Sequence, residues 1–199
     1  MQTKTKRLTE SAMLIAMAVV LELVGKMIFP PMPFGGQLTL CAMLPIVLIS
    51  YRHGVKWGLT AGFGYALVQM ALGAGTVTAA FQPGYFGDGA MIANALLMCA
   101  LDYVLAFSVL GLGGIFRKVR FTKNEGWDLF LSALFGALLV TVLRFLCHLV
   151  SGVAIWYALD LQWYADDPTH IVHRYGAWAF SAIYNGFYMV IDCAAVLLL

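Results

Sequence analysis

Charged side chains are scarce in this sequence. Asp, Glu, Lys and Arg make up 11% of its 199 residues, while 62% are hydrophobic and the mean hydropathy is +0.85. A soluble domain carries about 25% charged residues, because its surface must face water. This shortage excludes an ordinary water-soluble surface. Repeated apolar stretches of roughly 20 residues predict an all-α integral membrane protein with lipid, and no nucleic acid, among its partners.

The sequence also lacks the patterns that carry enzyme chemistry. Its four cysteines lie inside apolar segments without metal or redox spacing, which is typical of small buried hydrophobic residues. No nucleophile is accompanied by a histidine and an orienting acid, and no glycine-rich loop is suited to a phosphate. Two histidines beside acids in 166–173 are too few for a metal site. We therefore expect no catalytic residue, no metal, no cofactor and no ATP hydrolysis by the chain itself.

The apolar stretches predict one membrane domain, residues 1–199, with six transmembrane helices. Their approximate ranges are 8–29, 38–51, 55–75, 90–116, 128–158 and 174–199. The first stretch is longer than a signal-peptide core of about 7–15 residues and is not followed by a cleavage site, so we expect it to be retained. Three of the six prolines fall in 30–36, a turn that cannot continue a helix.

Lysine and arginine in the short connections predict the orientation of the helices. Nine of them fall on one side if six helices alternate: Lys4, Lys6, Arg7, Arg52, Lys56, Arg117, Lys118, Arg120 and Lys123. The opposite side holds Arg174 and Lys26, which is expected to pair with Glu22 four residues earlier. Because positive residues favour the cytoplasmic side, both termini are predicted to be cytoplasmic, with loops 30–37, 76–89 and 159–173 outside.

Three polar residues are predicted to lie deep in the membrane. At a rise of about 1.5 Å per residue, Asp102, Arg144 and Asn185 share a depth near the middle of the bundle. An ionisable group at that depth costs on the order of 3 kcal/mol, so each one is a functional hypothesis.

Polar and aromatic residues also share helix faces. One set recurs every four residues, namely Arg144, His148, Gly152 and Trp156, and another follows helical spacing, namely Trp178, Ser181, Asn185, Tyr188 and Asp192. Phe180 and Tyr184 flank the second set, and Asp102-Tyr103 lies on a third helix. Together they predict an aromatic-walled cavity with a few polar anchors, which is the usual form of a small-molecule site.

Taken singly, the same residues have structural interpretations. Arg144 and Asp102 could neutralise each other as a buried pair, and His148 could be a core histidine bonded to a neighbouring carbonyl. Trp156 could be an interfacial anchor, and Gly152 could serve helix packing.

Several segments together resemble the ThiT (YuaJ) family, the thiamine-specific substrate-binding subunits, or S components, of energy-coupling factor (ECF) vitamin transporters. The resemblance runs in order over the whole chain. It is carried by residues 143–152, Trp156, 181–186, 101–103, the Gly35-Gly36 turn and 44–62.

The resemblance implies a multi-pass subunit of the bacterial cytoplasmic membrane that captures extracellular thiamine and delivers it by reorienting. It implies partners as well, an ECF module of one membrane scaffold and two ATPases, onto which Ala12 and Ala16 of the first helix would dock. Close helix approach through small residues agrees with this role. Alternatives are specificity for a thiamine precursor or another small aromatic vitamin, or a solitary gradient-driven transporter in which Asp102 and His148 relay protons.

The resemblance also assigns roles within the site. Asp102 would face the cationic thiazolium, His148 and Asn185 would make polar contacts, Gly152 would let a ring approach, and Trp156 would stack on it. The full expected site is Asp102, Tyr103, His148, Gly152, Trp156, Phe180, Ser181, Tyr184 and Asn185. Asp102 stands where some members have glutamate, and Phe180 where tyrosine is common.

Overall fold

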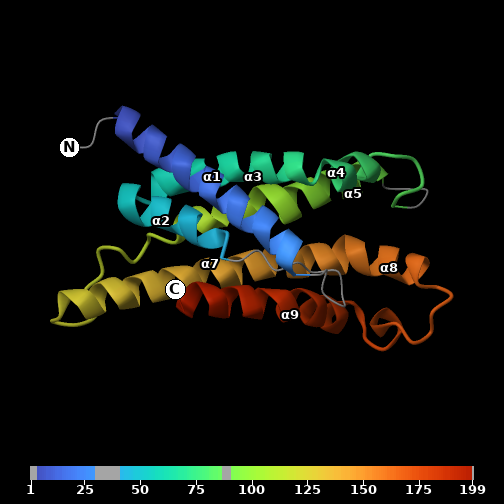
Figure 1. Cartoon of the computed structure of the whole chain (residues 1–199). Coiled ribbons are helices and arrows are strands. Elements are labelled where there is room, and N and C mark those ends of the chain that lie inside the picture. The colour runs from blue at the N-terminus through green and yellow to red at the C-terminus, as the bar shows by residue number, and fades with distance from the viewer. Residues whose placement is uncertain (1–3, 30–40, 87–90, 199) are drawn as a thin grey trace.

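The computed structural model describes residues 4–29, 41–86 and 91–198, which form helices joined by turns and contain no strand (Figure 1). The helices are α1 Lys4–Ile28, α2 Met43–His53, α3 Val55–Leu72, α4 Ala74–Ala80, α5 Met91–Met98, α6 Ala106–Ser108, α7 Glu125–Ser151, α8 Tyr157–Trp163 and α9 Ala177–Leu198. Two π-helical segments, η1 Cys99–Leu105 and η3 Gly152–Trp156, and two 3₁₀ segments, η2 Val109–Leu112 and η4 Ile171–His173, complete the order. The predicted all-α class is confirmed for the described residues.

Within this described part, three helices are long and apolar enough to cross a membrane: Lys4–Ile28, Met91–Leu112 and Glu125–Trp163. A fourth is added if the bent pair α3–α4 counts as one span. Each of the six predicted ranges contains helix, but the second begins later, at Met43. The proline turn at 30–36, with Gly35-Gly36, lies outside the described residues.

The helix expected at 55–75 differs most from its expected bounds. The helix ends at Leu72 rather than near residue 75, bends by 78° and resumes as α4. Gly73 lies at the bend, and a Cβ there would come within 2.4 Å of the Tyr103 hydroxyl. A larger residue at this position would require the Tyr103 side chain to shift where α3 passes η1.

The helix expected at 128–158 extends beyond both of its expected ends. Asn124 accepts hydrogen bonds from the backbone N–H groups of Gly126 (2.9 Å) and Trp127 (3.3 Å), so α7 begins at Glu125 instead of 128. Such a cap satisfies donors that a helix start leaves unpaired. The rod then continues through η3 and α8 to Trp163, past the expected end at 158. This extension places further side chains beside the predicted site.

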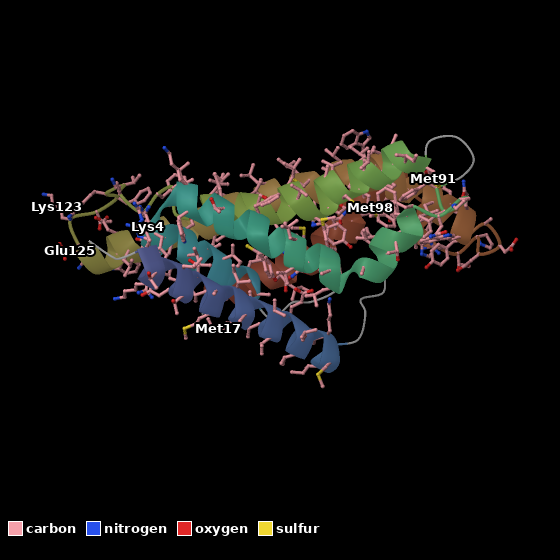
Figure 2. The ribbon with its side chains drawn as sticks, turned by 90° about the horizontal axis from the view of Figure 1, so that it is seen from above. Lys4, Met17, Met91, Met98, Lys123 and Glu125 are labelled. Carbon is pink, nitrogen blue, oxygen red and sulfur yellow. The ribbon has the colours of Figure 1, made fainter. Side chains whose placement is uncertain are left out.

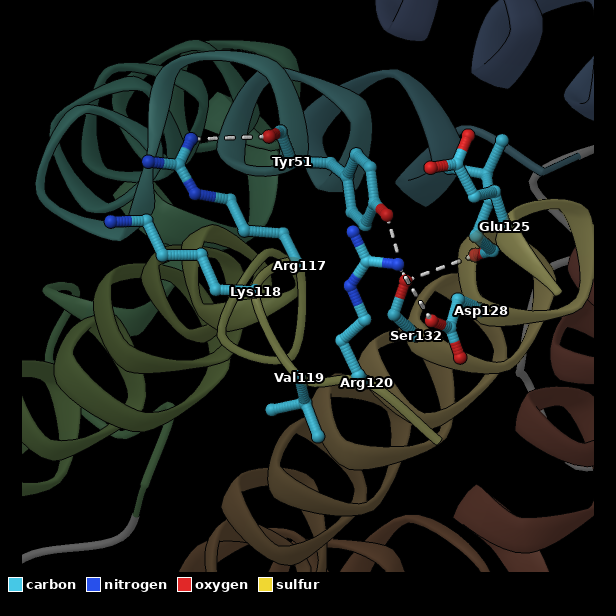
Figure 3. Close-up of a pocket in the computed structure, with 9 residues that line it drawn as sticks. Tyr51, Arg117, Lys118, Val119, Arg120, Glu125, Asp128 and Ser132 are labelled. Carbon is cyan, nitrogen blue, oxygen red and sulfur yellow. Dashed lines mark hydrogen bonds and ion pairs between the residues drawn. The ribbon is translucent and has the colours of Figure 1, made fainter. Parts of the chain in front are cut away.

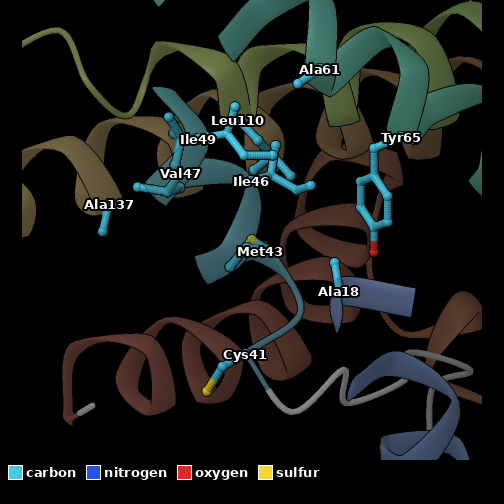
Figure 4. Close-up of a cluster of buried hydrophobic side chains, with 11 residues drawn as sticks. Ala18, Cys41, Met43, Ile46, Val47, Ile49, Ala61, Tyr65, Leu110 and Ala137 are labelled. Atoms are coloured by element: carbon cyan, nitrogen blue, oxygen red, sulfur yellow. The ribbon is translucent and has the colours of Figure 1, made fainter. Parts of the chain in front are cut away.

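Two clusters of buried hydrophobic residues hold the helices together. The larger joins α1, α2, α3, η2 and α7 around Ala18, Ile46, Ile49, Tyr65 and Leu110 (Figure 4). The smaller consists of Ala80, Ala95, Met98 and Ile155, with Tyr103 and Trp156 packed against it. α9 runs beside α7 (Figure 1). The smaller cluster is closely packed and therefore holds the rings of Tyr103 and Trp156, two residues of the predicted site, in place.

The outer surface of the bundle is apolar, as a lipid-facing surface must be. Large hydrophobic side chains on α1, α5, α7 and α9 are exposed, among them Met13, Ile92, Val142 and Val190. On α1, Ala12 and Ala16 are exposed as well.

Positive residues gather at the end of the bundle where α1 and α7 begin. Figure 2 shows Lys4, Lys123 and Glu125 at this end and Met91 at the other. Arg52 lies 3.5 Å from Glu10, which joins α2 to α1 there. Near the far end of α1, Lys26 Nζ lies 2.7 Å from Glu22 Oε1, so the predicted pair is confirmed.

Candidate functional site

A cavity of about 360 Å³ lies between η1–α6, the α7–η3–α8 rod and α9. All nine residues of the predicted site line it: Asp102, Tyr103, His148, Gly152, Trp156, Phe180, Ser181, Tyr184 and Asn185. Phe107, Asp160, Trp163 and Tyr188 complete the lining. The structure therefore brings together three segments that are far apart in the chain.

Both π-helical segments face this cavity. Asp102 and Tyr103 belong to η1, and Gly152 and Trp156 belong to η3. Segments with i→i+5 hydrogen bonds are rare and occur frequently at functional sites, because the wider turn changes which side chains share a face. Here Ser151 and Trp156 both reach Asp102, although five residues separate them.

The Asp102 carboxylate is held by three donors from the opposite helix. Oδ2 accepts hydrogen bonds from Ser151 Oγ (2.7 Å) and Trp156 Nε1 (2.8 Å), and Oδ1 lies 3.0 Å from His148 Nδ1. Each of these donors is directed at a lone pair of a carboxylate oxygen. They also fix the carboxylate at the cavity wall without any lysine or arginine.

The structural interpretation that paired Arg144 with Asp102 is wrong. Arg144 is 6% exposed and lies over the Phe107 ring, with its guanidinium carbon 4.9 Å from the ring centroid. Among the described residues, no carboxylate forms an ion pair with it. Side chains of a helix point back toward its N-terminus, which directs Arg144 away from the turn where His148 meets Asp102.

One ring nitrogen of His148 has a hydrogen-bond partner, and the other has none among the described residues. Because Nδ1 faces a carboxylate oxygen at 3.0 Å, we assign the ring proton to Nδ1. Nε2 is buried and has no hydrogen-bond partner among the described residues. In this tautomer Nε2 is an acceptor beside the cavity, suited to a donor group on a ligand. The His148 ring therefore contacts a carboxylate, and the interpretation in which it bonds a neighbouring carbonyl is wrong.

Ser181, Asn185 and Gly152 join α9 to α7. Ser181 Oγ donates to the Leu149 carbonyl (2.9 Å), and Asn185 Nδ2 donates to the His148 carbonyl (3.2 Å). A Cβ on Gly152 would clash with Ser181 Oγ. These polar groups therefore satisfy the carbonyls that precede η3, and the glycine permits the close approach of the two helices. Helix packing, the structural interpretation of Gly152, is what the geometry favours.

Aromatic rings form most of the remaining wall. Phe180 is buried, and its ring lies 5.9 Å from that of Tyr184. At the other side, Phe86 contacts Trp156 edge to face, with ring centroids 6.2 Å apart. Tyr85 contacts Trp163 in the same way at 5.8 Å, so the connection after α4 packs against two aromatic residues of the cavity wall.

Sequence reasoning missed Phe107, Asp160 and Trp163 and misplaced Trp178. Trp178 is 63% exposed and does not line the cavity, although the rest of its predicted face is buried. Asp160 continues the spacing of four residues that begins at Arg144, so the signal was present in the sequence. It was overlooked because the helix was expected to end at 158.

The charge of the lining decides which ligands it suits. Asp102 and Asp160 contribute two carboxylates, and neither lysine nor arginine is among the described lining residues. The aromatic faces add the negative quadrupole that attracts cations. The cavity is thus suited to a small, aromatic and positively charged molecule.

Comparisons with known proteins agree with this character. The family described as "Thiamine transporter protein (Thia_YuaJ)" matches residues 8–199. "Thiamine transporter ThiT" of Bacillus subtilis (strain 168) is 34% identical over 200 residues, covering 97% of this chain and 88% of that protein. The protein of the same name from Lacticaseibacillus paracasei is 26% identical over 152 residues, covering 72% and 61%.

A solved structure of ThiT from Listeria monocytogenes superposes with a TM-score of 0.68. It covers 99% of this chain and 92% of that one, at 23% sequence identity. At that identity the likeness shows a shared fold.

Proposed function

Because the chain belongs to the thiamine transporter family Thia_YuaJ, we propose that it is the thiamine-binding S component of an ECF vitamin importer. It is a multi-pass membrane transporter and not an enzyme. In the proposed function it captures extracellular thiamine and releases it inside the cell by reorienting in the membrane. ATP hydrolysis on partner subunits drives that movement.

The Asp102 carboxylate is the observation that carries this proposal. Three donors hold it at the wall of an aromatic cavity, and Arg144 does not neutralise it. A thiazolium cation in the cavity would gain both this charge and the face of an aromatic ring such as Trp156, a contact worth about 0.5–2 kcal/mol. A neutral ring of the same shape would gain neither electrostatic contribution.

His148 supplies a second point of recognition. Its Nε2 is an acceptor without a partner among the described residues, and thiamine carries an amino group on its pyrimidine ring. A hydrogen bond from that amino group would satisfy the buried nitrogen, whose desolvation otherwise costs about 1–3 kcal/mol. The two rings of thiamine would thus be read by two adjacent residues, Asp102 and His148.

The same lining disfavours phosphorylated ligands. A phosphate would bring negative charge to a cavity with two carboxylates, Asp102 and Asp160, and no basic lining residue among those described. We therefore propose free thiamine as the substrate in preference to its phosphates. A thiamine precursor that lacks the thiazolium would leave Asp102 without its cation.

The proposed topology has six transmembrane helices with both termini in the cytoplasm. The concentration of lysine and arginine at the end where α1 and α7 begin supports it. The cavity lies toward the opposite end of the α7 rod and would open to the outside. Exposed Ala12 and Ala16 on α1 would dock onto the membrane scaffold of the ECF module, through small residues that permit close helix contact.

Ligand titration of the purified protein tests the binding proposal. Trp156 and Trp163 line the cavity, so thiamine should quench tryptophan fluorescence, and thiamine diphosphate should require far higher concentrations. Trp156→Phe should remove much of the signal, whereas Trp178→Phe, at an exposed position outside the cavity, should retain it. An unchanged spectrum at micromolar thiamine would contradict the assigned substrate.

Uptake by cells tests the partner proposal. Ala16→Trp should block thiamine uptake and leave binding intact, because a large ring would prevent docking of α1. Met27→Trp is the matched control, since this residue is also exposed on α1 but lies near its C-terminal end, whereas Ala16 lies near its middle. If uptake continues in cells without the shared ATPases, a gradient-driven transporter is the better account.

A further inference from the structure

A second cavity, also of about 360 Å³, lies at the other end of α7 (Figure 3). The end of α2, the connection that leads into α7 and the first turns of α7 enclose it. Its lining consists of Tyr51, Arg117, Lys118, Val119, Arg120, Glu125, Asp128, Leu129 and Ser132. Along α7 the nearest lining residues of the two cavities, Ser132 and His148, lie about 24 Å apart at a rise of about 1.5 Å per residue, so the two sites are separate.

Three cations line this cavity, and most of their donors are unused. Arg117 is positioned by one bond, from its Nη1 to the Tyr51 carbonyl at 3.2 Å. Lys118 has no hydrogen-bond or ion-pair partner among residues 4–29, 41–86 and 91–198. Arg120 is 71% exposed along its side chain and reaches Asp128 Oδ2 only at 4.0 Å. The guanidinium and ammonium groups are therefore free to bind an anion.

The two carboxylates of the lining do not cancel these charges. Asp128 Oδ1 is occupied by the backbone N–H groups of Phe121 (2.8 Å) and Thr122 (2.6 Å), which tie the connection to α7. Glu125 is exposed in the first turn of α7. Three cations against two carboxylates leave the lining net positive.

One flank of the cavity is apolar and exposed. Leu129 is 57% exposed, and Val119 is exposed too, although both line the cavity. Beside them Trp127 and Phe130 form an exposed edge-to-face pair with ring centroids 5.9 Å apart. Exposed Trp at the start of an apolar helix is typical of the membrane–water interface. The basic side chains of the cavity therefore lie close to the level of the membrane at which the lipid acyl chains begin.

We propose that this cavity binds the headgroup of an anionic phospholipid. Arg117, Lys118 and Arg120 contact the phosphate, and Leu129 and Val119 contact the first methylenes of the acyl chains. Basic pockets between transmembrane helices recognise lipid headgroups in this way, and guanidinium groups bind phosphate oxygens in pairs. The apolar flank distinguishes a lipid from a free phosphate ion, which gains nothing from Leu129.

The experiment measures phospholipid binding to the full chain in neutral detergent by native mass spectrometry. Phosphatidylglycerol should bind and phosphatidylcholine should not. Each cation is worth about fivefold in affinity, so the triple variant Arg117→Gln, Lys118→Gln, Arg120→Gln should bind phosphatidylglycerol on the order of 100-fold more weakly. The matched control, Lys4→Gln, Lys56→Gln, Lys123→Gln, removes three exposed charges at the same end without touching the lining.

Several outcomes would overturn the proposal. An equal loss in the control triple would mean that diffuse surface charge attracts the lipid. Displacement of phosphatidylglycerol by millimolar inorganic phosphate would mean a free-anion site. Unchanged lipid binding in the lining triple, combined with loss of binding to the ECF module, would make this face a protein interface.

A milder variant keeps the test valid if the triple variant does not fold. Leu129→Ser leaves every charge in place, and Leu129 is exposed, so folding should be unaffected. It should weaken phosphatidylglycerol and leave its deacylated headgroup, glycerophosphoglycerol, unchanged, because only the intact lipid has methylenes that contact residue 129. An unchanged affinity for phosphatidylglycerol in this variant, or an equal loss for both ligands, would contradict the assigned orientation of the headgroup.

Discussion

Asp102→Asn removes the charge that the proposed function relies on and changes little else in shape. Asparagine retains one carbonyl oxygen, which can still accept from Ser151 and Trp156, as Oδ2 does in the wild type. Its amide then faces His148 Nδ1, which must lose its proton to accept that hydrogen bond. The histidine proton moves to Nε2, and the acceptor beside the cavity becomes a donor. One substitution thus removes both the carboxylate and the acceptor that thiamine would use.

The size of the effect follows from Coulomb's law. A cation about 5 Å from the carboxylate gains about 3 kcal/mol at an effective dielectric constant of about 20. Loss of that energy weakens thiamine binding on the order of 100-fold, and the reversed histidine adds to the loss. Stability should change by no more than about 1 kcal/mol, because two of the three hydrogen bonds persist and the third is reversed in direction. Isothermal titration with thiamine, paired with thermal unfolding, measures both quantities.

Two controls distinguish the effect of the Asp102 charge from the effect of any negative charge in the lining. Asp160→Asn removes the other carboxylate of the lining, which has no hydrogen-bond partner among the described residues, and should weaken binding less than Asp102→Asn. A neutral thiamine analogue should bind wild type and Asp102→Asn with more similar affinities than thiamine does. If Asp102→Asn binds thiamine within about threefold of wild type, or loses both ligands equally, Asp102 does not act as the counter-charge.

Two further predictions concern packing and pH. Gly152→Ala places a methyl group against Ser181. It should lower the melting temperature and weaken thiamine binding at least tenfold (~1.4 kcal/mol). A double variant that adds Ser181→Gly should recover part of both losses. Gly64→Ala, where a Cβ meets nothing within 4 Å, is the neutral control, and an equal effect there would refute the clash. In the loop before α9, hydrogen bonds from Thr169 lower the pKa of Asp167 below 3.8. The turn should therefore keep this stabilisation above the ordinary carboxyl pKa and lose it as pH falls through the lowered value. An NMR titration of the Thr169 amide measures that pKa, and a midpoint at or above 3.8 would contradict the prediction.

Sequence patterns located most of the candidate site because helical spacing is local. Arg144, His148, Gly152 and Trp156 share a face whatever the rest of the chain does, and a polar residue in an apolar stretch is conspicuous. All nine expected residues line one cavity, although their contacts with thiamine stay a prediction. The missed residues of the rod lie beyond an expected helix end, and helix boundaries depend on capping and tertiary contacts. The rod that carries Asp160 and Trp163 was expected to stop too early for this reason.

Composition and spacing by themselves determined the class of protein, because a chain with so little charge must use lipid as solvent. They also determined which residues share a helix face. The tertiary structure alone decided which faces meet. Asp102 is paired with His148, Ser151 and Trp156 and not with Arg144, since π-helical turns and side-chain direction act across helices that are far apart in sequence. Gly152 likewise acquires its packing role only when Ser181 of α9 lies against it.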